Sequence, residues 1–354
     1  MGDKLSVAVL GSTGLVGQRF VQLLHDHPWF ELEVLTASER SVGLKYGEAV
    51  RWVWSDGPPE SVCDLRVAST SYESVKDVDV VFSALPSSVA RDVEVELARR
   101  GKVVVSNASP LRMEPDVPLV NPEVNWDHLR LVEAQRERRG WRGFVAKNPN
   151  CTTAILTLTL KPLLDEYGIA RVRVATMQAL SGAGYRGVYS MDILDNIVPF
   201  IKEEEEKVHR ETRKILGKLS GDGVEPLPIG VAASCHRVPV LEGHLEAVFV
   251  ELRERPSSLD EVVEVLRRFR GRPQELGLPT APERPVVVRT ELDRPQPRLD
   301  RDVGRGMSVV VGRVRWSEAS DRELKYLALG SNTVRGAAGA AVLIAELLVA
   351  EGYI

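Results

Sequence analysis

Cysteine is scarce in this sequence, whose 354 residues include only Cys63, Cys151 and Cys235. A sparse, odd count argues against a framework of disulfide bonds and is typical of a reducing compartment. The N-terminal residues also lack the basic region, apolar region and small-residue cleavage site of a secretory signal peptide. We therefore expect a cytoplasmic protein.

Long apolar runs and an excess of basic charge are missing as well. No uninterrupted apolar stretch approaches the roughly 18 residues that suggest a membrane span. The formal net charge is -4, whereas a nucleic-acid-binding protein needs a basic stripe. With 44% hydrophobic and 27% charged residues, the composition is that of a soluble globular protein. We expect about two domains and neither a membrane nor a nucleic acid as partner.

The N-terminus carries a glycine-rich turn between a strand and a helix. Residues 5–10 read as a buried strand, and residues 18–25 have helical spacing of apolar side chains. The turn matches the dinucleotide fingerprint G-x-x-G-x-x-G, because glycines let backbone N–H groups approach a pyrophosphate at the helix N-terminus. An ordinary strand-to-helix turn is the alternative. The expected cofactor contacts are Gly11, Ser12, Thr13, Gly14, Leu15 and Val16.

The end of the second strand, residues 31–38, indicates which dinucleotide binds. A domain selective for NAD usually places an acid there to bind the ribose 2′-hydroxyl. This chain has Ser38, Arg40 and Ser41 instead, and hydroxyls with a guanidinium suit the 2′-phosphate of NADP. The negative charge of Glu39 does not suit a 2′-phosphate unless its side chain points to solvent. The alternative is that this segment is a polar loop without function.

Further strands and helices alternate through residue 146. Strands are expected over 79–86, over 102–107 and around 145–146, with a helix over 89–100, and Ser83 is a further candidate cofactor contact. This alternation predicts an α/β fold with a Rossmann-like, doubly wound parallel sheet. Residues 1–150 would form an NADP-binding domain, completed by a C-terminal helix within 332–354.

The second half has a different pattern. Residues 171–180, 245–252 and 307–314 alternate like strands with one solvated face, and residues 256–269 read as a helix. The proline-rich residues 273–297 read as a loop. We expect residues 151–331 to form an α+β catalytic and dimerisation domain with a mostly antiparallel sheet. The alanine-rich helix over 333–348 would return to pack on the first domain.

Cys151 follows the turn Asn148-Pro149-Asn150 and precedes an apolar, helix-compatible run. This position places a thiol at a helix N-terminus, where free N–H groups and the helix dipole stabilise an anion. A thiolate there is a nucleophile. The alternative is an inert, buried cysteine, which is the commoner case.

Three other segments bear on this cysteine. His244 precedes a strand, and histidine is the usual partner of a cysteine nucleophile because its pKa lies near the working pH. Arg237 could bind a carboxylate through two parallel hydrogen bonds. Taken alone, the acidic run 203–206 is typical of a solvated helix face. Taken alone, His244 could be a surface histidine or one that only stabilises the fold.

Together, six motifs in order give the chain a resemblance to aspartate-semialdehyde dehydrogenase, in the branch found in archaea, fungi and some bacteria. The motifs are the glycine turn, Asn148 to Thr153, Met177 to Tyr185, the acidic run ending in Lys207, Arg237 to His244, and Asn332 to Gly339. The resemblance implies that Cys151 attacks L-aspartyl-4-phosphate, that phosphate leaves a thioester, and that NADPH reduces this thioester to L-aspartate 4-semialdehyde.

The resemblance also implies a role for each site residue. His244 would move the proton, Gln178 would orient the substrate, and Arg237 would bind its α-carboxylate. Glu204 would face the α-amino group, Lys207 and Arg112 would hold the phosphate, and Asn332 would contact the nicotinamide amide. Ser181 and Gly182 are further expected cofactor contacts. Among the glutamates of the acidic run, Glu204 is the expected contact because it shares a helix face with Lys207. We expect no metal ion, and we expect the protein to form a homodimer or a homotetramer.

One position departs from the resemblance. Relatives typically carry proline where this chain has Arg186, whose charge beside the active-site loop could bind a second anion. Malonyl-CoA reductase, a sibling that acts on a CoA thioester, therefore remains an alternative. An NADP-binding protein without activity is a second alternative, but it would not need Cys151, Gln178, Arg237 and His244 together.

Overall fold

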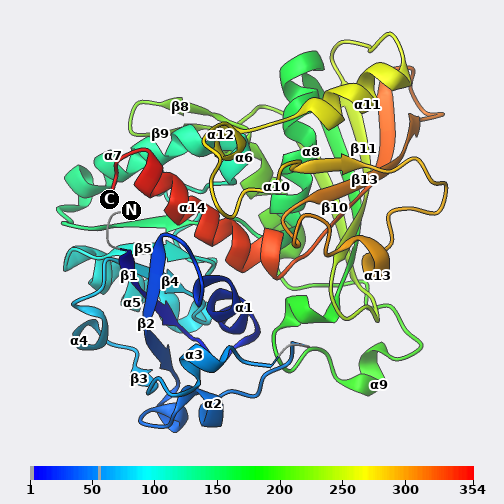
Figure 1. Cartoon of the computed structure of the whole chain (residues 1–354). Helices are drawn as coiled ribbons and strands as arrows, with labels where there is room; N and C mark the ends of the chain where they lie inside the picture. Colours follow the sequence, from blue (N-terminus) through cyan, green and yellow to red (C-terminus); the bar gives the residue numbers. More distant parts are fainter. Residues whose placement is uncertain (1–3, 55–56) are drawn as a thin grey trace.

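The first of the two large sheets consists of parallel strands. In a computed structural model, which describes residues 4–54 and 57–354, its strand order is β3-β2-β1-β4-β5-β6 (Figure 1). The strands are β1 (Leu5–Leu10), β2 (Phe30–Ala37), β3 (Ala68–Ser69), β4 (Val80–Ser83), β5 (Val103–Ser106) and β6 (Phe144–Lys147). Their helices are α1 (Leu15–Leu24), α2 (Tyr46–Ala49), α3 (Glu60–Cys63), α4 (Tyr72–Val75), α5 (Ser87–Arg99), α6 (Pro122–Asn125) and α7 (Leu131–Arg139), with 3-10 turns at Glu39–Ser41 and Trp126–Arg130.

The central strands of this sheet are apolar throughout because both faces are covered. Val7, Val9, Val80 and Val105 are completely buried in one core cluster. The side chains that alternate with them along the same strands, Ala8, Val81 and Val104, belong to a second cluster on the opposite face. Continuous apolar strands are expected where helices lie on both faces of a parallel sheet. All of its strand pairs are parallel, so the doubly wound sheet predicted from the sequence is confirmed.

The second sheet is mixed, with the order β10-β7-β11-β14-β13-β12. Its strands are β7 (Ile169–Gln178), β10 (Gly230–Arg237), β11 (His244–Leu252), β12 (Val286–Val288), β13 (Val309–Trp316) and β14 (Glu323–Gly330), and a separate hairpin joins β8 (Lys218–Ser220) to β9 (Gly223–Glu225). Three of its pairs are antiparallel and two, β10 with β7 and β12 with β13, are parallel. The expected α+β half with a mostly antiparallel sheet is confirmed.

Helices cover this sheet on the side that carries the core. They are α8 (Cys151–Tyr167), α10 (Glu204–Ile215) and α11 (Leu259–Arg268), whereas the short helices α9 (Ser190–Ile193), α12 (Arg272–Glu275) and α13 (Pro297–Asp300) and a 3-10 turn at Leu180–Ala183 belong to the connecting segments. Leu156, Val208 and Val265 from α8, α10 and α11 share one buried cluster with Val172 and Val248 of the strands. The long, almost fully buried α8 therefore fixes its first residue, Cys151, against the sheet.

The chain ends in α14 (Gly339–Ala350), which follows a π-helical turn at Val334–Ala338. Figure 1 shows α14 in red above the first sheet, and its residues join that sheet's core cluster through Val342, Ile344 and Leu347. The C-terminal helix thus packs against the N-terminal half of the chain.

The proline-rich stretch 273–297 is not only a loop, as the sequence suggested. The short strand β12 pairs with β13 at the sheet edge, and parts of α12 and α13 flank it. Proline is tolerated beside an edge strand, so the residue pattern did not exclude this pairing. No helix in either described segment is long and apolar enough to cross a membrane.

Candidate active site

The turn before α8 is held from several directions. Asn150 is the N-cap of the helix, and its side-chain Oδ1 accepts the N–H of Thr153 at 3.1 Å. Its own backbone N–H donates to Oε2 of Glu211 at 2.6 Å. On the other side, a Cβ added to Gly336 would lie 2.6 Å from Cβ of Cys151, so only glycine allows the π-helical turn to approach this closely. These contacts fix where the thiol points.

Cys151 faces His244 across the site. The distance from Sγ to Nε2 of His244, the first residue of β11, is 3.3 Å. The other ring nitrogen, Nδ1, accepts the backbone N–H of Ala179 at 3.1 Å. Because an accepting nitrogen carries no proton, the neutral ring is protonated on Nε2, the nitrogen that faces the sulfur.

Burial, rather than the helix dipole, dominates the charge state of this pair. It raises the pKa of the Cys151 thiol to about 12, with the negative charge of Glu204 acting in the same direction. Arg237, the N–H of Thr152 and Arg112 lower the pKa by less. Burial and then Arg237 lower the pKa of His244 to about 3. The expectation of a thiolate in the free protein was therefore wrong, because loss of solvation outweighs the field of the helix N-terminus.

Glu204 is the buried member of the acidic run. Its two carboxylate oxygens accept from Nδ2 of Asn150 at 3.0 Å, and Oε1 also accepts from Oγ1 of Thr152 at 3.1 Å. Nε2 of Gln178, at the end of β7, donates to the same oxygen at 3.0 Å and to Thr152 at 2.8 Å. Gln178 and Glu204 therefore lie together beside the residue that follows Cys151, as one hydrogen-bonded unit.

The three cationic side chains predicted to bind substrate, Arg237, Arg112 and Lys207, lie in different places relative to Cys151. Nη1 of Arg237, at the end of β10, donates to the carbonyl of Ala179 at 2.7 Å. Arg112 pairs with Glu211 at 2.9 Å, and its Nε is buried with no hydrogen-bond partner among the described residues. Lys207 lies in the first half of α10, with its Nζ 3.5 Å from Oε2 of Glu203. It does not line the cavity that the described residues form in front of Cys151. Arg112 thus lines the cavity, Arg237 lies behind Gly182 beside His244 without lining it, and Lys207 lies farther along α10.

A cavity of about 370 Å³ joins the cysteine to the glycine turn. Its lining includes Gly14, Leu15, Val16, Ala84, Leu85, Pro86, Asn107, Arg112, Cys151, Ser181, Gly182 and Asn332. Asn332 connects this lining to the loop before His244, because its Oδ1 accepts the N–H of Gly243 at 2.9 Å and its Nδ2 donates to Oγ of Ser181 at 2.8 Å. We call this space the catalytic cavity.

The glycine turn has the geometry that a dinucleotide requires. Gly11 has φ +75°, and a Cβ there would lie 2.8 Å from the carbonyl oxygen of Ala84. Gly14 is the N-cap of α1, so no side chain covers the first N–H groups of that helix. Ser12 is buried and Thr13 is partly exposed in the turn.

The remaining candidate cofactor contacts lie on either side of this turn. Ser38 and Arg40 are exposed after β2, and Ser41 is partly exposed, at the same sheet edge as the turn. Ser83 differs, because it is completely buried and its hydroxyl donates to Glu94 at 2.8 Å. The residues after it, Ala84 to Pro86, line the cavity instead.

Two buried acids were missed in the sequence. Glu211 contacts both the Cys151 turn and Arg112, and its spacing of seven residues from Glu204 was the available signal, since residues seven apart share a helix face. Glu242 lies two residues before His244 and had no distinguishing pattern. Across residues 4–54 and 57–354, no group of three or more His, Cys, Asp or Glu side chains could hold a metal ion.

Comparison with known proteins assigns the chain to a family. Residues 6–132 match the semialdehyde dehydrogenase NAD binding domain, and residues 160–335 match the semialdehyde dehydrogenase dimerisation domain. The aspartate-semialdehyde dehydrogenase of Methanothermobacter thermautotrophicus is 58% identical over 97% of this chain and 99% of its own. The malonyl-CoA reductase (NADP) of Metallosphaera sedula is 42% identical, over 100% of this chain and 99% of its own.

A solved structure agrees along the whole chain. Aspartate-semialdehyde dehydrogenase with NADP from Candida albicans superposes with a TM-score of 0.91 at 42% identity, covering 99% of this chain and 100% of that one. The resemblance stated from the sequence motifs is thereby confirmed. The protein is an oxidoreductase that belongs to the semialdehyde dehydrogenase family.

Proposed function

We propose that the protein catalyses the reversible, NADPH-dependent reductive dephosphorylation of L-aspartyl-4-phosphate to L-aspartate 4-semialdehyde through a thioester on Cys151. The observation that carries this proposal is the pair of Cys151 Sγ and His244 Nε2, 3.3 Å apart, of which Cys151 lines a cavity that extends to the glycine turn. A nucleophile and a dinucleotide turn in one cavity suit an acyl-transfer step followed by reduction.

NADP fits the residues at the glycine turn. The uncovered N–H groups at the start of α1 would hold the pyrophosphate, and Ser38, Arg40 and Ser41 would hold the 2′-phosphate. Asn332, Ser181 and Gly182 would contact the nicotinamide end, on the cavity wall next to Cys151. When bound, NADPH supplies the hydride that reduces the thioester carbonyl carbon.

Formation of the thioester balances without a separate base. The sulfur of Cys151 bonds to the acyl carbon as the bond from that carbon to the phosphate oxygen breaks. The thiol proton leaves on the phosphate, which departs as hydrogen phosphate. This route suits a thiol whose pKa is raised to about 12, because Cys151 begins the reaction protonated.

His244 would donate hydrogen bonds from Nε2–H to the carbonyl oxygen of the substrate and to Sγ of Cys151. A proton shuttle at Nε2 would require the ring to move its proton to Nδ1 and to lose the hydrogen bond from Ala179. We therefore propose a donor role: Nε2–H hydrogen-bonds to the oxyanion of the tetrahedral intermediates and to the sulfur as it leaves, and a proton from water then restores the thiol. A positioned donor of this kind stabilises charge only where it develops.

The substrate groups match the charges around the cysteine. Arg237 would bind the α-carboxylate and Glu204 the α-amino group, while Gln178 holds Glu204 in place. Arg112 lines the catalytic cavity and would hold the phosphate there, and Lys207 would approach from α10. A guanidinium is well suited to carboxylate and phosphate because its donors form a planar fork.

The reverse reaction tests this proposal. Purified protein should reduce NADP when given L-aspartate 4-semialdehyde and phosphate, and Cys151→Ala should abolish the reaction. Phosphate-dependent reduction that survives Cys151→Ala would contradict the thioester mechanism. Binding of NADP without turnover of either substrate would favour the binding-protein alternative.

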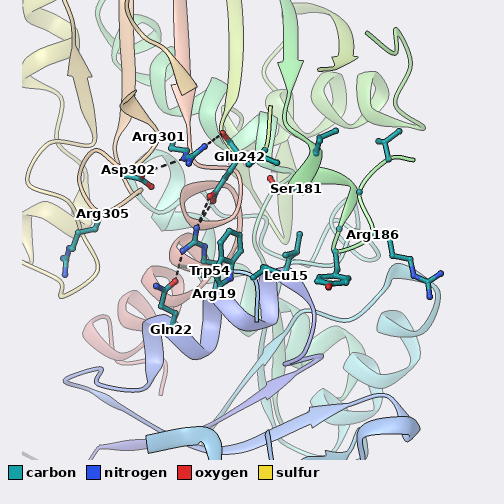
Figure 2. Close-up of a pocket in the computed structure, with 17 residues that line it drawn as sticks. Leu15, Arg19, Gln22, Trp54, Ser181, Arg186, Glu242, Arg301, Asp302 and Arg305 are labelled. Carbon is teal, nitrogen blue, oxygen red and sulfur yellow. Dashed lines mark hydrogen bonds and ion pairs between the residues drawn. The ribbon is translucent and has the colours of Figure 1, made fainter. Parts of the chain in front are cut away.

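Malonyl-CoA is the second candidate substrate, and Arg186 is the observation that favours it. Arg186 is exposed and lines a neighbouring cavity of about 760 Å³, on the opposite side from Arg301 and Arg305 (Figure 2). NADPH oxidation with malonyl-CoA, and none of the phosphate-dependent reverse reaction, would overturn the leading proposal. Arg186→Pro would then show whether this residue sets the preference.

We also propose a homo-oligomer, a dimer or a tetramer, formed through the second half of the chain. Large apolar side chains are exposed there on one segment: Tyr189, Met191, Leu194, Ile197 and Phe200. Such a patch marks an interaction site.

The proposed domain boundaries are residues 1–150 with 332–354 for the NADP-binding domain, and residues 151–331 for the catalytic and dimerisation domain. The three cysteines are free, which supports a cytoplasmic location.

A further inference from the structure

Glu242 is a buried acid that the proposed mechanism does not use. It lies between β10 and β11, two residues before His244, and only 6% of it is exposed. Its Oε1 and Oε2 accept from Nη2 of Arg19 at 3.1 and 3.0 Å. Oε1 also accepts from the hydroxyls of Ser331, at 3.1 Å, and Thr333. We call these four residues the Glu242 cluster.

The partners of Glu242 come from distant parts of the chain. Arg19 lies on the second turn of α1, the helix whose N-terminus is the glycine turn. Ser331 and Thr333 flank Asn332, which lines the catalytic cavity. Figure 2 shows Arg19 and Glu242 pointing toward one another, with the dashed contacts running from α1 to the loop above it.

Further contacts limit the movement of the cluster. Nε of Arg19 donates to Thr333 at 3.1 Å, and its guanidinium carbon lies 3.5 Å from the ring centre of Trp54. Nη1 of Arg301 donates to the backbone carbonyl of Glu242 at 3.3 Å. The N–H of Gly243, between Glu242 and His244, donates to Asn332. The loop that precedes His244 is thus fixed to both α1 and the Asn332 segment.

We propose that Glu242 is a positioning residue, which fixes the distance between the dinucleotide turn and the reacting atoms at Cys151 and His244. This inference rests on the proposed function, because it concerns the transfer of hydride between cofactor and thioester. Hydride transfer depends steeply on distance, and a misplacement of about 1 Å can cost on the order of 100-fold in rate. A carboxylate that holds α1, the His244 loop and the Asn332 segment together sets that distance.

The test separates positioning from stability. In Glu242→Gln the side chain keeps its size but loses its charge, so the grip on Arg19 weakens while Ser331 and Thr333 keep an acceptor. We expect the single-turnover rate of NADPH formation, measured by stopped flow with semialdehyde and phosphate, to fall roughly 10- to 100-fold. The dissociation constant of NADP, measured by fluorescence titration, should change less than about 3-fold, because no contact to the cofactor is removed.

Asp116→Asn is the matched control. Asp116 is also a buried acid held by one arginine, Arg139, but among the described residues this pair makes no hydrogen bond to α1, to the loop before His244 or to the Asn332 segment. This control should lower the melting temperature without slowing the single turnover. Arg19→Met should slow it as Glu242→Gln does, and the double variant should be no slower than either single variant, since all three break the same link.

The outcomes are distinct. A single-turnover rate in Glu242→Gln that matches that of the wild type, whatever the melting temperature, would overturn the proposal. So would an equal loss of rate in Asp116→Asn. If Glu242→Gln does not fold, Glu242→Asp tests the same link by shortening the side chain while keeping its charge, and a single-turnover rate equal to that of the wild type would again overturn the proposal. Absence of turnover in the wild type would instead contradict the proposed function and leave the effect on hydride transfer to be measured with malonyl-CoA.

Discussion

At the scale of single residues, the thiol of Cys151 gives a prediction about pH. Its pKa is raised to about 12, so only the small thiolate fraction reacts with an alkylating agent in the free enzyme. Below the pKa this fraction increases about tenfold per pH unit. We therefore expect the rate of alkylation by iodoacetamide to rise steadily between about pH 7 and pH 9, without a plateau.

Mass spectrometry of the modified peptide identifies Cys151, and Cys151→Ser provides the background from Cys63 and Cys235. A rate that is already constant across neutral pH would show a stable thiolate and imidazolium pair. In that case the proton balance proposed for thioester formation would be wrong.

The two ring nitrogens of His244 predict different effects of two substitutions. An amide nitrogen of Gln can occupy the place of Nε2, whereas that of Asn lies nearer the place of Nδ1. If the role is donation from Nε2, His244→Gln should keep a kcat at least about tenfold above that of His244→Asn, because one well-placed donor is worth two to three orders of magnitude in rate. Equal loss in both variants would indicate that His244 must take up a proton. The pH profile of kcat separates these cases, since a donor-only role gives no ionisation of this residue near neutral pH.

The sequence predicted the identity of the central site residues better than their charge. Cys151, His244, Arg237 and Gln178 were named from motif and resemblance, and the structure places all four around one helix start. The thiol pKa could not be inferred, because burial by residues from α10, β7 and β10 depends on tertiary packing. For the same reason the partners of Glu242, more than 80 residues away on either side, left no local pattern.

At the scale of elements, the 3-10 turn Leu180–Ala183 carries a testable close contact. A Cβ added to Gly182 would lie 2.6 Å from Nη1 of Arg237 and 3.1 Å from Cε1 of His244. We expect Gly182→Ala to displace the Arg237 guanidinium and to raise KM for the semialdehyde by roughly 10- to 100-fold, the value of one charged hydrogen bond. Steady-state kinetics with phosphate and NADP held saturating measures this change.

Gly230→Ala is the control for this substitution. Gly230 begins β10, the strand that ends in Arg237, and a Cβ there meets only an ordinary contact of 3.7 Å with Arg171. Its KM should match that of the wild type. An unchanged KM in Gly182→Ala would mean that Arg237 does not bind the substrate.

Elements with regular spacing could be predicted, and those defined by their partners could not. Five strands of the first sheet, β1, β2, β4, β5 and β6, were placed to within a few residues, whereas the two-residue edge strand β3 was not predicted. The edge strand β12 consists of three residues among prolines, and it is a strand only because β13 lies beside it. Likewise the predicted C-terminal helix begins with a π-helical turn, which forms where Gly336 packs against Cys151.

At the scale of the whole molecule, a buried ion pair connects the C-terminal segment to the first half of the chain. Arg335, in the π-helical turn, and Glu123, in α6, are buried, and two hydrogen bonds of 2.7 and 2.6 Å join them. Nε of Arg335 also donates to the carbonyl of Met307 at 2.6 Å. The pair therefore holds the segment behind Cys151 to a helix of the first half of the chain.

Removal of Arg335 should destabilise the fold more than removal of the pair. Arg335→Met leaves the carboxylate of Glu123 buried without a cation, and we expect a loss of about 3–5 kcal/mol in stability, seen as a lower melting temperature. In the double variant Arg335→Met with Glu123→Gln the charge is gone, so part of this loss should return. Differential scanning fluorimetry of both variants and of Glu123→Gln alone completes the cycle. If the double variant melts no higher than Arg335→Met, the stranded charge is not the cause, and packing of the arginine side chain against the π-helical turn accounts for the loss instead.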